Sequence, residues 1–100
     1  MIIKRFHKKF PFSDTPYTLC FTCCHVLDND KPILYVSHDE DGYWQFLCGQ
    51  KHSQEDARVV SLSEIISFDK TLLKLADLQC GEYAQSKENK REWIVYKKNS

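Results

Sequence analysis

The chain of 100 residues has only three glycines, Gly42, Gly49 and Gly81, and they stand far apart. A phosphate-binding loop needs glycines clustered within a few residues, because its backbone must approach the phosphate closely. The chain also lacks the Gly-x-Ser-x-Gly segment in which serine hydrolases present their nucleophile. The sequence therefore gives no support for a nucleotide cofactor and contains no serine nucleophile elbow.

Net charge and long apolar runs are also absent. Fourteen Lys and Arg balance fourteen Asp and Glu, whereas proteins that bind nucleic acid usually carry a basic excess. No apolar run approaches the length of about 20 residues that spans a membrane. Near the N-terminus, Lys8, Lys9 and Ser13 interrupt the continuous apolar segment that a signal peptide requires. We expect no nucleic-acid partner, no membrane association and a cytoplasmic location.

Cysteine is comparatively abundant. The chain has five cysteines, an odd number, and Cys23 and Cys24 are adjacent, which does not suit the disulfide framework of a small secreted protein. We expect reduced thiols. The apolar fraction of 42% is enough for one core and the length is too small for two. We predict a single domain over 1–100, with an N-terminal arm at 1–17 that packs Phe10, Phe12 and Tyr17 on a core at 18–98.

The pattern of apolar residues predicts β-structure in the first half of the core. Runs at 18–27, 33–36 and 43–48 are rich in β-branched and aromatic residues and are separated by clusters of turn-forming residues. We expect them to form a three-stranded antiparallel meander. In its last strand, alternation places Trp44, Phe46 and Cys48 on one face, which we predict to lie in the core.

The second half predicts two short helices between strands. A strand at 57–60 precedes Ser61, which stands three residues before Glu64 in the spacing of a helix N-cap. Asp69 is expected to cap a second helix, whose buried face carries Leu72 and Leu75 and which ends at Gly81. Segments 82–85 and 93–96 would form a closing hairpin. The prediction is an α+β fold: a small antiparallel sheet of about five strands with two short helices on one face.

One hypothesis for a site is a zinc ion held by Cys20, Cys23, Cys48 and His52, whose local spacings are typical of structural zinc sites. The meander opposes this set, because its first and third strands would lie about 9 to 10 Å apart. A second hypothesis pairs Cys23 with His25 on one strand face as an activated thiol. The alternative is a buried cysteine and a hydrogen-bonded core histidine. No oxyanion site is evident, so we do not predict an enzyme.

Acidic residues gather in two loops. The first contains Asp39, Glu40 and Asp41, and the second contains Glu55 and Asp56. One interpretation is ordinary solvated loops. The other is an acidic surface that, with exposed aromatic side chains, binds a basic protein partner.

Four segments together resemble a family of small bacterial domains whose activity is not established. In that family a Cys-x-His-Val element precedes a Trp-Gln-Phe-Leu-Cys-Gly element, and a Leu-Ala-Asp-Leu helix end follows; here these match 23–26, 44–49 and 75–78, with 32–39 between them. The chain is also similar to immunity-type domains, which bind and block toxins. The resemblance implies a toxin-like partner. We predict a non-enzymatic protein-binding module, with a zinc-binding or thiol-dependent protein as the alternative.

Overall fold

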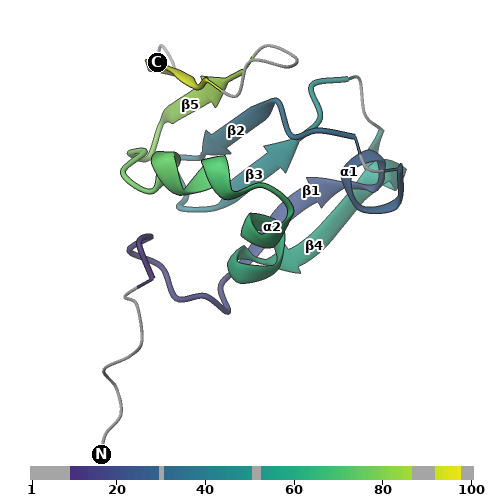
Figure 1. Cartoon of the computed structure of the whole chain (residues 1–100), viewed down its shortest axis with the longest axis horizontal. Helices are drawn as coiled ribbons and strands as arrows, with labels where there is room; N and C mark the ends of the chain where they lie inside the picture. Colours follow the sequence, from purple (N-terminus) through teal and green to yellow (C-terminus); the bar gives the residue numbers. More distant parts are fainter. Residues whose placement is uncertain (1–9, 30, 51–52, 87–91, 98–100) are drawn as a thin grey trace, which may run out of the picture.

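The computed structural model describes residues 10–29, 31–50, 53–86 and 92–97 (Figure 1). In chain order the elements, with η for a 3₁₀ helix, are β1 (Leu19–Cys23), α1 (Cys24–Asn29), β2 (Tyr35–His38), β3 (Trp44–Leu47), η2 (Gln54–Asp56), β4 (Ala57–Ser61), α2 (Leu62–Phe68), η3 (Lys70–Leu75), β5 (Glu82–Gln85) and β6 (Ile94–Lys97). The α+β class is confirmed, with six strands in place of about five. No helix in the described ranges is long and apolar enough to cross a membrane.

All six strands form one mixed sheet in the order β4-β1-β3-β2-β5-β6. Strands β1 and β3 run parallel, with Phe21 opposite Gln45, and every other neighbouring pair is antiparallel. The predicted meander over 18–48 is therefore wrong, because β3 lies between β1 and β2. An entirely antiparallel sheet is wrong for the same reason.

The difference begins at Cys23. We expected a strand up to Leu27 followed by a hairpin loop, but the strand ends at Cys23 and α1 follows at once. From residue 23 to residue 27 the buried residues are Cys23 and Val26. They are three positions apart, which is the spacing of a helix and not of a strand. Helix α1 ends strand β1. Strand β2 then does not pair with β1, because β3 lies between them in the sheet.

The core lies on one face of the sheet, around Trp44. Trp44, Phe46 and Cys48 are 4% exposed or less, as alternation predicted. The indole of Trp44 stacks on the His38 ring at a centroid distance of 3.9 Å, and it packs edge to face with Phe12 at a centroid distance of 5.0 Å.

Part of the N-terminal arm contributes to this core. Phe12 is buried and Phe10 packs against the core, as expected. Tyr17 is 82% exposed, so the contact predicted for it is wrong. Residues 1–9 of the predicted arm lie outside the described residues.

Both helix starts in the second half are confirmed. The Ser61 hydroxyl accepts a hydrogen bond from the Glu64 amide at 3.1 Å, and Asp69 accepts one from the Thr71 amide at 2.9 Å. The second helix is a 3₁₀ helix that ends at Leu75, not an α-helix that continues to Gly81. Leu72 and Leu75 are its buried residues, and their spacing of three matches the period of a 3₁₀ helix.

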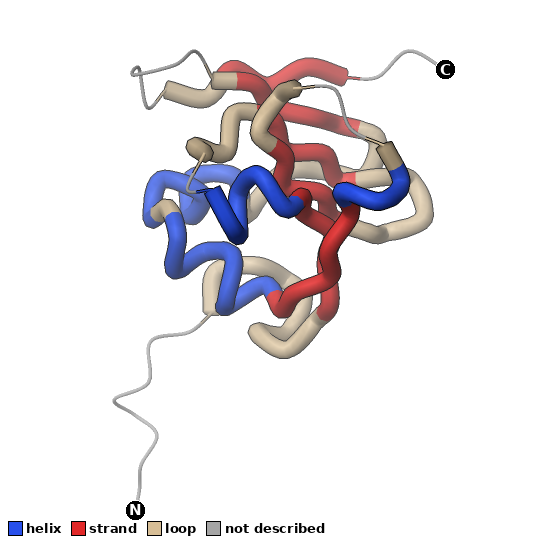
Figure 2. The backbone as a smooth tube through the Cα atoms, turned by 90° about the vertical axis from the view of Figure 1, so that its right-hand side faces the viewer, coloured by secondary structure: helices blue, strands red, loops and turns tan. Residues whose placement is uncertain are grey.

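The described helices lie on one face of the sheet and none of them covers the other. Helices α2 and η3 lie together against one face (Figure 2), and their leucine and isoleucine side chains join Val36 and Phe46 in the core. None of the described helices packs on the other face, where Leu19, Phe21 and Val59 are exposed.

Candidate functional site

The uncovered face of the sheet is apolar and aromatic. Successive residues of a strand point to opposite faces, so in β1 the buried Cys20 and Thr22 alternate with the exposed Leu19 and Phe21. Strand register extends this surface across the sheet. We call it the open sheet face, and its members are Leu19, Phe21, Tyr35, Tyr43, Gln45, Leu47, Val59, Tyr83, Ile94 and Tyr96.

Aromatic side chains of this face support one another in pairs. Tyr83 stacks on Tyr96 with ring centroids 5.1 Å apart, and Tyr35 lies 5.6 Å from Tyr83. On the same face, toward β1 and β3, Phe21 packs edge to face with Tyr43 at a centroid distance of 5.6 Å. Rings held in this way present large contact areas with few rotatable bonds, which reduces the entropy lost when a partner binds.

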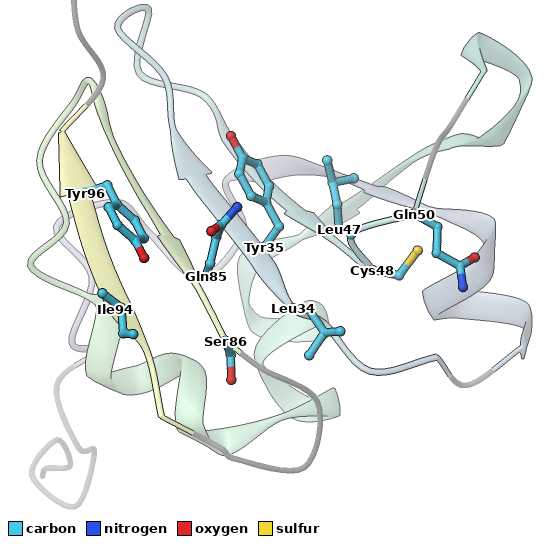
Figure 3. A pocket seen from close by; sticks show the side chains of 10 residues that line it. Leu34, Tyr35, Leu47, Cys48, Gln50, Gln85, Ser86, Ile94 and Tyr96 are labelled. Atoms are coloured by element: carbon cyan, nitrogen blue, oxygen red, sulfur yellow. The ribbon is translucent and has the colours of Figure 1, made fainter.

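The open sheet face is hollowed at two places. One hollow, of about 580 Å³, lies between β3 and β6. Figure 3 shows Tyr96, Gln85, Tyr35 and Leu47 in a row across its strands. The other, of about 260 Å³, is lined by Phe21, Gln45 and Ala57 among others, and Leu47 borders both. Concave apolar surface with a few polar groups is typical of binding sites.

The predicted acidic loops stand at opposite ends of this face. Residues 39–42 join β2 to β3 next to Trp44, whereas η2 leads into Ala57 at the far end of β4. Because β1 pairs in parallel with β3 and Ala57 pairs with Cys23, the two loops are separated by the length of the strands. They do not form one cluster, but each borders the open sheet face.

The acidic side chains differ in how much local structure depends on them. Asp39 accepts hydrogen bonds from Gln45 at 2.7 Å and from Ser37, and Asp41 accepts one from the Tyr43 amide at 3.1 Å. Asp56 accepts one from the Ser53 amide at 3.0 Å. Glu40 and Glu55 are exposed, and neither carboxylate is seen in a hydrogen bond in the described part of the chain.

Thiols and an imidazole meet at the edge of the sheet where β1 and β3 end. Cys23 is the last residue of β1, His25 lies in α1, and Cys48 follows β3. Their ligand atoms lie within 4.8 Å of one another. Cys48 Sγ is 3.6 Å from His25 Nδ1. We call these three residues the thiol cluster.

A second group shares the histidine. Cys24, His25 and Asp56 also have ligand atoms within 4.8 Å of one another, and the Cys24 thiol lies 3.6 Å from Asp56 Oδ1.

The zinc set predicted from sequence is not brought together as a whole. Cys23 and Cys48 meet because β1 and β3 are neighbours, so the predicted separation of 9 to 10 Å is wrong. Cys20 is buried in the core and belongs to neither group. His52 lies outside the described residues.

Burial governs the chemistry of these thiols. Desolvation, and to a lesser extent the negative charge of Glu64, raises the pKa of Cys20 to about 12. Desolvation and a hydrogen bond with Cys23 raise the pKa of Cys48, although a backbone contact at Gln50 opposes the shift. A thiol with a raised pKa stays protonated at neutral pH, so it is a poor nucleophile.

Sequence reasoning missed two parts of this arrangement. It placed His25 on the same strand as Cys23, whereas His25 lies in α1 and still reaches Cys48. It did not identify Phe21 as exposed or place Tyr83 on the same face of the sheet. A signal for the open sheet face was present, because Leu19 and Phe21 are apolar in the phase opposite to Cys20.

Comparison with protein-family models, with curated proteins and with solved structures finds no match to this chain.

Proposed function

We propose that this protein is a non-enzymatic binding module whose open sheet face binds a basic protein partner. The observation that carries the proposal is the row of aromatic and aliphatic side chains on a sheet face that no described helix covers. A monomeric protein rarely leaves a large contiguous apolar surface in water, and such surfaces commonly mark sites of interaction.

The open sheet face is smaller than a standard protein–protein interface. Six strands spaced about 4.8 Å apart span about 24 Å, and strands of about five residues are about 16 Å long, which gives a footprint of about 400 Å². A standard interface buries about 800 Å² on each partner. A partner of ordinary size therefore extends beyond the strands to the acidic loops at both ends.

Charge at the border indicates a basic partner. Residues 38–57 contain five acids and one lysine, a formal charge of −4. Aromatic side chains on a sheet also stack with the bases of RNA in some proteins, but acidic borders would repel its phosphates. Opposite charge on a protein partner would raise the association rate and orient the encounter. A basic toxin of the kind that immunity-type domains block has this chemistry.

Capture of the partner from the cells that make this protein, followed by calorimetry with the purified partner, tests the proposal. The double variant Phe21→Ser, Val59→Ser removes two exposed apolar side chains from the open sheet face. Phe68→Ser, Leu73→Ser is the matched control, because these side chains are exposed at 44% and 40% on the helical layer. We expect the first pair to weaken binding at least tenfold and the control to leave it unchanged.

Charge is tested separately from apolar contact. Glu40→Lys and Glu55→Lys reverse exposed charges in both loops without removing a hydrogen bond seen in the structure. We expect them to slow association and to reduce its salt dependence, while Asp77→Lys beyond η3 does neither. A partner that is acidic, or equal losses from the open-face pair and the control pair, would refute the proposal.

A further inference from the structure

We propose that Cys23, His25 and Cys48 form a zinc-binding site. This proposal stands apart from the proposed binding function, because it concerns the edge of the sheet and a different ligand. Parallel neighbouring strands end at the same edge of a sheet, so Cys23 at the end of β1 and Cys48 just beyond β3 arrive side by side. Helix α1 starts directly after Cys23 and turns His25 back toward them.

The distances fit a tetrahedral ion. Zinc bonds of about 2.3 Å to sulfur and about 2.0 to 2.1 Å to nitrogen place sulfur and nitrogen about 3.6 Å apart at a tetrahedral angle. Cys48 Sγ and His25 Nδ1 are 3.6 Å apart, and all three ligand atoms lie within 4.8 Å of one another. Small side-chain adjustments bring three donors to one ion, with no movement of the strands.

Two further candidate ligands lie beside His25, and one of them can hold its ring. Cys24 and Asp56 stand with His25 in the second group of ligand atoms within 4.8 Å. Neither side chain is grouped with Cys23 and Cys48, so the structure supplies three donors and leaves the fourth position of a tetrahedral site to water or to one of these side chains after it moves. A carboxylate beside a ligating imidazole can instead accept its other N–H and fix the ring orientation, as is common around metal-bound histidine.

Donor chemistry selects the class of metal. Two sulfurs and one imidazole nitrogen are soft or borderline donors, which favour zinc over magnesium or calcium, whose ligands are oxygens. Cys23 is completely buried and Cys48 is 4% exposed, so bulk water does not compete for most of the coordination sphere. Cys23 lines the smaller hollow of the open sheet face and Cys48 the larger one, which gives an ion a path of entry.

The chain contains its own comparison. Cys80 Sγ lies 3.7 Å from His38 Nε2, nearly the same distance as in the thiol cluster. Among the described residues, Cys80 and His38 belong to no group of three or more possible metal ligands. An ordinary cysteine–histidine contact explains Cys80 and His38 completely. The convergence of a second thiol from a separate strand distinguishes the thiol cluster.

Metal analysis of the untagged full chain tests the proposal. The protein is purified with a phosphine reductant and no chelator, exposed to zinc and dialysed. We expect about one equivalent of zinc in the unmodified chain. Cys80→Ser and Cys20→Ala are matched controls, the first for a cysteine beside a histidine and the second for a buried cysteine. Both should keep the metal, whereas Cys23→Ser, Cys48→Ser and His25→Ala should each lose most of it.

Cobalt spectroscopy of the unmodified chain gives a readout that does not depend on variants that fold poorly. Cobalt in the site should show sulfur-to-metal charge-transfer absorption and the intense visible bands of tetrahedral coordination, and zinc should abolish both. Well under one equivalent of zinc, a cobalt spectrum without sulfur ligation, or equal metal loss in the Cys80 and Cys20 controls would overturn the proposal.

Discussion

Replacement of Trp44 tests two opposing contributions of this residue to stability: the packing of its ring in the core and the cost of its unsatisfied Nε1–H. The side chain is 1% exposed and is packed between His38, Phe46 and Phe12. Trp44→Ala removes the whole indole from this site and should lower the free energy of unfolding by about 3 to 5 kcal/mol. Its Nε1 is buried without a hydrogen-bond partner in the described structure, so the wild-type residue already carries a cost.

Trp44→Phe removes that cost together with part of the ring. The smaller side chain should lose about 1 to 2 kcal/mol of packing. It also relieves an unsatisfied buried N–H, which costs about 1 to 3 kcal/mol. The two effects oppose one another, so we expect the variant to lie between about 1 kcal/mol less stable and about 2 kcal/mol more stable than the unmodified protein.

Trp93 provides the matched comparison, because its Nε1 donates a hydrogen bond to Thr71 Oγ1 at 3.1 Å. Trp93→Phe therefore loses a bond worth about 0.5 to 1.5 kcal/mol and relieves nothing. Urea unfolding followed by far-ultraviolet circular dichroism measures all three variants. A loss for Trp44→Phe as large as that for Trp44→Ala would refute the reasoning about the unsatisfied N–H. A stable Trp44→Ala protein that had lost only its binding would show that Trp44 acts in the binding site and contradict its role in the core.

Three further predictions concern a cap, a turn and a buried thiol. Ser61→Ala removes the acceptor for the Glu64 amide and should cost about 1 kcal/mol in urea unfolding. Ser63→Ala removes only the side-chain hydrogen bond to Ser61 at 3.2 Å and keeps the capping acceptor, so it should cost less. Gly42→Ala should cost about 1 kcal/mol, because Gly42 has φ of +94° with nothing within 4 Å of an added Cβ, so the penalty is in the backbone alone; an unchanged midpoint would contradict it. Burial raises the pKa of the Cys20 thiol from 9.0 to about 12 in the folded protein. Its stabilising contribution is therefore complete below pH 9 and is lost as pH rises toward 12. The free energy of unfolding should fall by no more than about 1.4 kcal/mol per pH unit from this group. Unfolding measured from pH 8 to pH 10.5 should therefore show a smaller loss of stability for Cys20→Ala than for the unmodified chain, and parallel curves would exclude this contribution.

Local signals in the sequence predicted most of the individual elements. Alternation identified the buried face of Trp44, Phe46 and Cys48, and the Ser61 cap located the start of α2. These signals depend on residues that are near one another in the chain, and they survive in the folded protein for that reason.

The order of the strands could not be obtained in this way. Parallel pairing of β1 with β3 depends on contacts between distant segments. It also depends on a six-residue helix that begins inside an apolar run, where strand and helix patterns are not distinguishable by periodicity alone. Because the sequence pattern does not predict the helix that begins at Cys24, it predicts the wrong neighbour for β1.

The candidate sites were affected by that same error. With β1 and β3 separated, Cys23 and Cys48 were expected to be too far apart for one ion, and with β1 extended, His25 was expected on a strand. The acidic residues were recognised from composition, but their positions at opposite ends of the open sheet face follow only from strand register.

Site-specific photocrosslinking in cells tests the binding function most directly. A photoreactive phenylalanine analogue is placed at Tyr43 or Tyr96 on the open sheet face, and at Phe68 on the helical layer as the control; all three side chains are at least 40% exposed. The proposal predicts that Tyr43 and Tyr96 positions capture the same basic protein and that the Phe68 position does not. Capture from Phe68 with none from the open sheet face, or capture only of a second copy of this chain, would contradict it.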